Sequence, residues 1–288
     1  MTQLLREGPV LVLNVFTGYL GDLKIHGAVL GEERYLEEAA AAAFMGFESH
    51  SLGELGAPFR RPAYRQLGNI FRPPVAEDLH WLPSLRQRIF GELGKIDFQQ
   101  LLVPLGVGWH VDHVVTHMVF DAWVEQDKLL YYEDASYCCI PHATRYRLDD
   151  IATYAVTPSD DSLLPFNETR AWWQAAKAYA NTALMKNLQP WILRKLAVPA
   201  TSIYLYRLMG QHRSRATAAI KRAFVATSVS FGQTDLDHKV DAMALYGSQF
   251  KEFFESREDC VATLGSYCRR SRQRGISAER YWLLHGSA

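Results

Sequence analysis

The sequence carries no excess of charge of either sign, because 31 lysine and arginine residues balance 31 aspartate and glutamate residues. A strongly basic or acidic chain would favour nucleic acid or an acidic substrate as a partner, so this balance gives no reason to expect nucleic acid. No apolar stretch reaches the roughly 20 residues of a membrane-spanning helix. No secretory signal pattern precedes the first predicted strand, and we therefore expect a soluble, cytoplasmic protein.

Cysteine is also scarce, with 4 residues in 288 positions. Cys138, Cys139, Cys260 and Cys268 show no spacing that is typical of a metal site. The adjacent pair Cys138 and Cys139 is poorly suited to a disulfide with each other. We expect reduced and mostly buried thiols, which agrees with a cytoplasmic location.

What the sequence does contain is an alternation of predicted strands and helices. Residues 9–17 form a near-continuous apolar run, as expected for a strand buried on both faces of a parallel sheet. Further strands are predicted over 98–105 and 128–132, and helices over 32–47, 78–93 and 114–126, with a loop over 60–74. This alternation predicts an α/β fold with a Rossmann-like, mostly parallel sheet flanked by helices.

The pattern changes beyond about residue 157 to long helices. These are predicted over about 168–187 and 235–270, with a strand over 223–229 between them. A chain of this length allows one large domain or two small ones. We interpret residues 1–157 as an α/β core, and residues 158–288 as a helical cover and C-terminal extension of the same domain.

Three polar signals fall where predicted strands end. They are Thr17 with Gly18, His110 with His113, and Glu133 with Asp134. In open α/β sheets, ligands bind beyond the carboxyl ends of the strands. The sequence therefore predicts a functional site on that rim.

The segment Gly106-Val107-Gly108-Trp109-His110-Val111-Asp112-His113 is the strongest of these signals. Residues at i and i+3 share a face where a strand leads into a helix, so both imidazoles can converge on one point. One histidine can bind a metal ion while the other donates a hydrogen bond to a developing oxyanion. Catalytic zinc normally requires three protein ligands, and this segment supplies only one or two.

Residues 185–222 mix basic and aromatic side chains. Such a mixture can cradle phosphate or lie at a membrane surface. It is more typical of an ordinary helical cover with a solvated charged face. Both interpretations stay open.

The ordered motifs resemble the PIG-L (GlcNAc-phosphatidylinositol de-N-acetylase-like) family of zinc-dependent N-deacetylases. The matching segments, which together cover about residues 5 to 285, are 12–18, Arg34-x-x-Glu37, 104–108 with His110-x-Asp112-His113, 132–137, 239–249 and 278–282. The family's first strand ends in His-Pro-Asp-Asp, which supplies two zinc ligands and the general base. The sequence begins inside what resembles the helix after that motif, so we expect the family's first strand to be missing. The nearest imitation, residues 157–161, lacks the histidine.

The resemblance implies roles for individual residues. His113 takes the place of a zinc ligand, and His110 takes the place of the group that stabilises the tetrahedral intermediate. Asp112 would orient one of these rings. The bound zinc would lower the pKa of its water, so that hydroxide attacks an acetamide carbonyl.

Substrate-binding positions are implied at Arg34, Thr17 and Glu133. Arg34 matches a position that contacts substrate hydroxyls, or else forms an ion pair on its own helix with Glu37 or Glu38. His117, four residues after His113, is either a substitute metal ligand or a helix-face histidine without a metal. Asp134, like Glu133, lines the pocket or caps a helix.

Two functions follow, with a third in reserve. The first is a zinc-dependent N-deacetylase that acts on an N-acetylated sugar or related amide, in a shortened form; it predicts an in-frame His-Pro-Asp-Asp strand upstream of the codon for Met1. The alternative is an inactive family member that acts as a sugar-binding or partner protein, without that sequence and without stoichiometric zinc. The third is an enzyme of altered chemistry that uses His110, His113 and His117.

A missing first strand has a physical cost. Losing several buried side chains at ~2–5 kcal/mol each would remove most of a domain's ~5–15 kcal/mol of stability. This cost modestly favours a shortened start over a natural variant. A stable protein would otherwise need compensation, and we expect a homo-oligomer or a rearranged sheet edge.

Overall fold

The structure is a computed structural model that describes residues 2–21, 31–156, 168–182, 186, 194–216, 222–270 and 277–284. The chain divides into two compact units that interleave along the sequence. The first unit comprises Met1–Ile70, Thr182–Leu184 and Phe231–Gly265, and the second comprises Phe71–Asn181, Met185–Ser230 and Ser266–Ala288. The predicted division of one domain at residue 157 stays a prediction.

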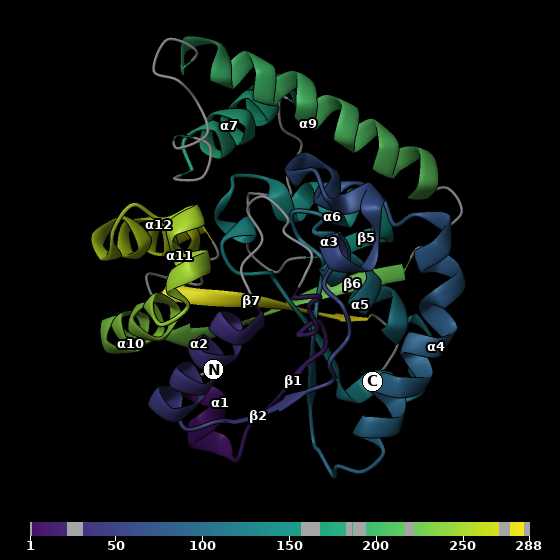
Figure 1. Ribbon diagram of the computed structural model, residues 1–288. Coiled ribbons are helices and arrows are strands. Elements are labelled where there is room, and N and C mark those ends of the chain that lie inside the picture. The colour runs from purple at the N-terminus through teal and green to yellow at the C-terminus, as the bar shows by residue number, and fades with distance from the viewer. Residues whose placement is uncertain are drawn as a thin grey trace. The chain divides into compact units, whose positions relative to one another are not determined.

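The first unit contains a small parallel sheet whose strands are joined through a helix (Figure 1). Strand β1 (Leu11–Asn14) pairs in parallel with β2 (Glu48–Ser51), and helix α2 (Gly31–Met45) lies between them in the chain. Parallel neighbours need such a crossover, because a tight turn can only return the chain antiparallel. The apolar run over 9–17 thus forms a strand as predicted, although pairing covers only its middle.

Helix α2 ends where glycine permits a left-handed backbone. Gly46 has a φ of 81°, and its amide donates to the carbonyl of Ala42 at 2.8 Å. This conformation stops the helix and satisfies one of its last carbonyls. The helix predicted over 32–47 is therefore confirmed within two residues at each end. A short helix α1 (Thr2–Glu7) precedes β1, in agreement with the helical turn expected there.

A glutamate on α2 fixes the start of a later helix in the same unit. Both carboxylate oxygens of Glu37 accept from Ser248, one from its amide and one from its hydroxyl, each at 2.6 Å. Ser248 lies in the first turn of α11 (Gly247–Phe253), where unpaired amides favour a carboxylate. The single helix predicted over 235–270 is wrong in this respect, because the structure has three: α10 (Gln233–Ala244), α11 and α12 (Arg257–Arg270).

The next residue on α2 joins three more parts of the first unit. Glu38 accepts from the hydroxyl of Tyr246 at 2.6 Å, from Nδ2 of Asn14 at 2.7 Å and from the hydroxyl of Ser49 at 2.9 Å. Burial and the neighbouring Glu38 carboxylate raise the pKa of Tyr246. The segments around Arg34-x-x-Glu37 and 239–249, separated by about 200 positions, therefore meet through hydrogen bonds.

The second unit is built on a mixed five-stranded sheet of order β3-β4-β7-β6-β5. Its strands are β3 (Leu101–Pro104), β4 (Leu129–Tyr132), β5 (Ala152–Val156), β6 (Arg222–Phe231) and β7 (Ser277–Leu284). β3 pairs with β4 and β5 pairs with β6 in parallel, whereas β7 runs antiparallel to β4. This sheet, flanked by helices, is a Rossmann-like α/β fold as predicted.

Helices of the second unit include α4 (Ala76–Leu93), α5 (Val111–Val119), α6 (Ala143–Ile151), α7 (Glu168–Ala180) and α9 (Arg194–Ala216). Helices α7 and α9 pack against each other, as Figure 1 shows. The helices predicted over 78–93 and 168–187 are confirmed, the second in a shorter form. The helix predicted over 114–126 starts earlier, at Val111, and ends at Val119 before the short 3-10 helices η3 (Phe120–Ala122) and η4 (Gln126–Lys128).

The core of the second unit lies along β3, β4 and β7. Trp282, Tyr131 and Leu129 are fully buried. Val107 and Val111, which follow β3 in the chain, are fully buried as well. Alternation on β4 places Leu129 and Tyr131 on one face, because successive strand residues point to opposite sides. The 4 cysteines are all buried and unoxidised. None of the helices in the described part of the chain combines the length and the apolar character of a membrane span.

Candidate functional site

The loop after β3 has a backbone that only glycine adopts easily. Gly106 and Gly108 both have a φ of 82°, in the left-handed region. A Cβ atom at Gly108 would lie 2.5 Å from Cγ of Tyr137, so no other residue fits there without displacing that ring. The glycines of the Gly-Val-Gly segment therefore let the loop turn sharply against Tyr137.

Trp109 extends this bend although it has a side chain. Its φ is 62°, a conformation that costs a non-glycine residue on the order of 1 kcal/mol. Its indole Nε1 donates to Oδ2 of Asp150 at 2.6 Å, and its ring stacks on His212 with centroids 5.1 Å apart. These contacts hold the bend and deliver the next residue, His110, to the start of α5.

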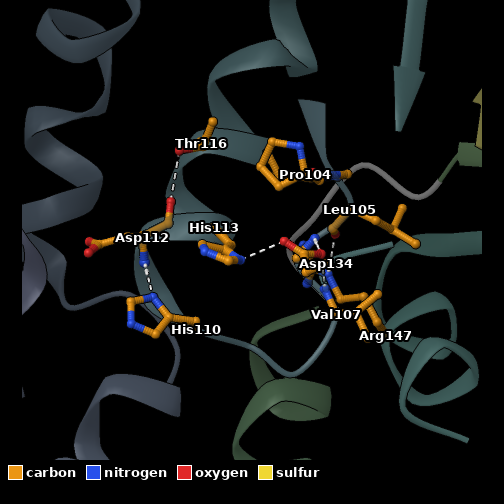
Figure 2. A network of polar contacts seen from close by, with 11 residues as sticks. Pro104, Leu105, Val107, His110, Asp112, His113, Thr116, Asp134 and Arg147 are labelled. Atoms are coloured by element: carbon orange, nitrogen blue, oxygen red, sulfur yellow. Dashed lines mark hydrogen bonds and ion pairs between the residues drawn. The ribbon is translucent and has the colours of Figure 1, made fainter. Parts of the chain in front are cut away.

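His110 caps helix α5 with its own ring. Its Nδ1 accepts from the backbone amide of Asp112 at 3.3 Å, as a side-chain oxygen would at an N-cap (Figure 2). An accepting Nδ1 carries no proton, so the neutral ring carries its proton on Nε2. The cap therefore fixes the tautomer of His110 as a donor at Nε2.

His113, one turn into α5, faces a buried carboxylate. Its Nδ1 lies 2.5 Å from Oδ1 of Asp134, which is fully buried, while the His113 side chain is 37% exposed. The second oxygen of Asp134 accepts from the amides of Gly106 and Val107 at 2.8 and 2.7 Å (Figure 2). Asp134 is thus held on both oxygens, and it pins His113 so that Nε2 is the ring nitrogen left for a ligand.

The electrostatics of His113 follow from this pairing. Burial acts to lower the pKa of His113, but the charge and hydrogen bond of Asp134 act to raise it, with a smaller contribution from Asp112. The carboxylates prevail, so the pKa of His113 is raised above its usual value of 6.5. Protonation of His113 is therefore easier than for an isolated imidazole.

Aromatic rings surround the two histidines. The centroids of His110 and His113 are 5.1 Å apart, and Tyr137 lies 6.4 Å from the first and 6.0 Å from the second. Phe71 approaches His110 edge-on at 6.2 Å. The sequence did not predict Tyr137 or Phe71 as site residues; the 132–137 match to the family motif was the one available signal for Tyr137.

The surroundings of Asp112 and Glu133 in the structure differ from those that the sequence predicts. Asp112 is buried, and in Figure 2 its carboxylate points away from the His113–Asp134 pair, so that Asp134 is the carboxylate that orients His113. Glu133 is also buried rather than on an open rim. Its donors are Thr144 Oγ1 at 2.8 Å, Tyr267 OH at 3.1 Å, Arg280 Nε at 2.5 Å and Trp282 Nε1 at 2.9 Å.

His117 is a core residue. Its Nδ1 lies 3.1 Å from the carbonyl oxygen of Pro104, and its side chain is buried beneath Tyr131. Burial, and then the charges of Arg147 and Arg222, lower the pKa of His117 to about 3. His117 therefore stays neutral in the folded protein and serves the packing of α5 against β3.

Thr17 and Arg34 belong to the first unit, and their interactions are with residues of that unit. The hydroxyl of Thr17 contacts that of Ser51 and accepts from the amide of Gly53 at 3.1 Å. Arg34 is exposed on α2, and its charge acts on the carboxyl of Glu252. The predicted alternative of an ion pair with Glu37 or Glu38 receives no support, because those carboxylates bind Ser248 and Tyr246.

A catalytic zinc site needs more donors than the described part of the histidine site supplies. Over the described ranges, no group of three histidine, cysteine, aspartate or glutamate side chains is arranged to hold a metal ion. His113 offers one nitrogen, which is short of the three protein ligands of a catalytic zinc site. Residues 157–161, the nearest imitation of the family's first motif, lie outside the described residues. The residues that the structure describes therefore do not fit zinc as a resident cofactor.

Comparison with solved structures identifies proteins of the same fold. A teicoplanin-pathway deacetylase complexed with bog aligns at a TM-score of 0.62 and 14% identity, over 100% of this chain and 92% of that one. The zinc-inhibited form of teicoplanin deacetylase aligns at 0.61 and 13%, with coverages of 100% and 92%. The A40926 pseudoaglycone deacetylase aligns at 0.59 and 14%, with coverages of 100% and 90%.

These likenesses define the class of fold: a Rossmann-like α/β fold that is shared with antibiotic-pathway deacetylases. A scan against protein-family models gives no match. A search of curated protein sequences likewise gives no significant match.

Proposed function

We propose that this protein is an N-deacetylase-like amide hydrolase that acts on an N-acetylated sugar or a related amide. The observation that carries the proposal is the pairing of His113 with a buried Asp134 beside His110, whose Nε2 carries a proton. The shared fold with glycopeptide deacetylases supports the substrate class, since one of those proteins has been solved in complex with teicoplanin. The resemblance of the ordered motifs to the PIG-L family points to N-acetylglucosamine-type sugars.

His110 is assigned to the carbonyl oxygen of the amide. As the carbonyl becomes tetrahedral, its oxygen acquires negative charge, and a donor already in place stabilises that charge without reorganising. The cap to the Asp112 amide holds the ring of His110 in the required tautomer. His110 therefore stabilises the transition state more than the planar substrate.

His113 is assigned to proton transfer. With Nδ1 held by Asp134, Nε2 can take a proton from the attacking water and return it to the departing amine. Asp134 stabilises the imidazolium that forms in between, as a buried carboxylate does for a catalytic histidine. The products are acetate and a free amine, and no step of this scheme passes through a metal ion.

Release of acetate from N-acetylglucosamine and from N-acetylated glycopeptide sugars tests the proposal. We expect hydrolysis by the wild-type chain, with kcat lowered about 10²–10³-fold in His110→Ala and at least 10²-fold in His113→Ala. His80→Ala, on the exposed face of α4, is the matched control and keeps full activity. An inactive wild-type chain, or equal activity in all variants, contradicts the proposal.

A second function is a sugar-binding or partner role without hydrolysis. It is favoured by one observation, the lack of a three-donor metal group among the residues that the structure describes. Calorimetry that detects N-acetylated sugar binding in the absence of acetate release would identify this role. The proposed setting is the cytoplasm, where buried thiols stay reduced, and sedimentation would show whether the protein is a homo-oligomer.

A further inference from the structure

The second unit contains a cavity between the start of α6 and the end of α7. This cavity has a volume of about 540 Å³. It opens between residues 138–145, which include the first turn of α6, and residues 174–181 at the end of α7. Its volume is in the range of small-molecule sites, which run from about 300 to 1,000 Å³.

The cavity is lined by positive charge without negative charge. Arg145, Lys177 and Arg280 all contribute to its wall, and no aspartate or glutamate is among its lining residues. Arg280 is balanced by Glu133 at 2.5 Å, and Arg145 by the exposed Asp149 at 3.2 Å. Lys177 forms no ion pair within the described ranges, so its charge is the one left for a ligand.

The start of helix α6 adds a further positive contribution. Residues Ala143, Thr144 and Arg145 line the cavity, and they form the first turn of a nine-residue helix. The residue before them, His142, has a φ of 65° and gives the helix no side-chain cap. A helix N-terminus carries a partial positive charge and amides suited to an anion.

The rest of the lining combines amides with apolar surface. Gln174 and Asn181 add side-chain amides from α7 and its end, while Ile140, Pro141 and Ala178 add apolar walls. A ligand that matches this surface has an anionic end and an apolar body. Apolar walls with a few polar groups are typical of small-molecule sites.

We propose that this cavity binds a small anionic molecule through a carboxylate or phosphate group. Lys177 of α7 and Arg145, in the first turn of α6, bind that group. The apolar body of the ligand packs on Ile140, Pro141 and Ala178. Carboxylate and phosphate share the chemistry that these groups recognise, and paired cations give charge-assisted hydrogen bonds to either. The inference does not depend on the proposed hydrolysis.

The cavity is separate from the histidine site in its supporting contacts. Glu133 holds three residues of the cavity wall: Thr144, Tyr267 and Arg280. The following residue, Asp134, holds His113 instead. A variant of His113 should therefore leave anion binding intact, which makes failure of this inference distinguishable from failure of the proposed function.

Titration calorimetry with the full chain tests the site, using phosphate, phenyl phosphate, acetate and phenylacetate as probes. We expect phenyl phosphate or phenylacetate to bind more tightly than its small counterpart, because the apolar wall adds contact. Preference for one of these two probes identifies phosphate or carboxylate as the natural group. Absence of binding by all four probes overturns the inference.

Substitutions then locate the binding. Lys177→Glu should weaken binding by about tenfold or more, since it removes a charge-assisted hydrogen bond and adds a charge that repels the anion. Arg145→Gln should also weaken it, and His113→Ala should not. Lys95→Glu is the matched control, because Lys95 is an exposed lysine of the same unit that pairs with Glu92 away from the cavity. Equal binding by Lys177→Glu and Lys95→Glu overturns the inference.

Discussion

Nδ1 of His113 lies 2.5 Å from Oδ1 of Asp134, a carboxylate that is wholly shielded from solvent. The other oxygen of Asp134 is held by two backbone amides of the glycine loop. The two residues come from different parts of the chain, α5 and the end of β4. Their contact joins the histidine motif to the sheet and sets the charge and the orientation of the ring.

The first prediction concerns the titration of that ring. Asp134→Asn removes the charge and the hydrogen bond that raise the pKa of His113, so the pKa of His113 should fall. Histidine side-chain NMR across pH 4–9 measures the change. Asp127→Asn, an exposed carboxylate of the same unit, is the control and should leave the His113 resonance where it was. An unchanged pKa in Asp134→Asn would show that burial, not the carboxylate, governs this ring.

The second prediction concerns stability at His113. Its raised pKa means that folded protein binds the proton more tightly than unfolded protein does. The resulting stabilisation is fully present below about pH 6.5 and is lost as pH rises through the raised value. The difference in free energy of unfolding between wild type and His113→Gln should shrink over that upper range, as measured by urea denaturation. A difference that grows with pH would contradict the assignment.

The third prediction has the opposite sign, although its residue lies on the same helix. The pKa of His117 is lowered to about 3, so unfolded protein takes up a proton that folded protein refuses. Stability from the neutral ring is therefore present above about pH 6.5 and is lost as pH falls toward 3. The difference between wild type and His117→Gln should decrease by about 1.4 kcal/mol per pH unit between pH 6 and pH 4. A flat difference over this interval would mean that water reaches His117.

The fourth prediction concerns the glycine loop. Gly108→Ala places a Cβ 2.5 Å from the Tyr137 ring at a φ of 82°, so the free energy of unfolding should fall by a few kcal/mol. Gly91→Ala is the matched control, because Gly91 lies inside α4 with nothing within 4 Å of the added atom. There the exchange should be neutral or stabilise by up to about 1 kcal/mol. Chemical denaturation compares both variants, and equal stabilities would show that the loop can relax around Tyr137.

The fifth prediction concerns zinc. Chain purified without added metal should contain far less than one zinc per molecule, because the described part of the chain offers one histidine nitrogen instead of three donors. Excess zinc should inhibit hydrolysis, since Nε2 of His113 cannot hold a metal ion and accept a proton together. Elemental analysis and an acetate-release assay measure these effects. Tightly held equimolar zinc, or stimulation by zinc, would show that His113 is a metal ligand.

The helices were the most predictable part of the fold. The charged start and alanine run of α2 and the amphipathic pattern of α4 are local signals, and both helices were predicted within two residues. Strand β7 was not predicted, because Glu279 and Arg280 interrupt its apolar pattern. Arg280 is buried there through its contact with Glu133, a partner 147 positions away that no local pattern reveals.

The site was predictable in its position but not in its pairings. The ends of the predicted strands indicated His110, His113 and Asp134 on one rim, and the structure brings these three together in the second unit. That Asp134 rather than Asp112 orients His113 depends on the turn made by Gly106 and Gly108. Such a turn is a property of the folded loop, so spacing alone could not have identified it.

Glu133 and Asp134 are joined by one peptide bond, yet each anchors a different structure. One carboxylate ties down the wall of the cavity, and the other sets the ring of His113. The position of this one peptide is therefore fixed twice, by four side-chain donors to Glu133 and by two backbone amides and one imidazole at Asp134.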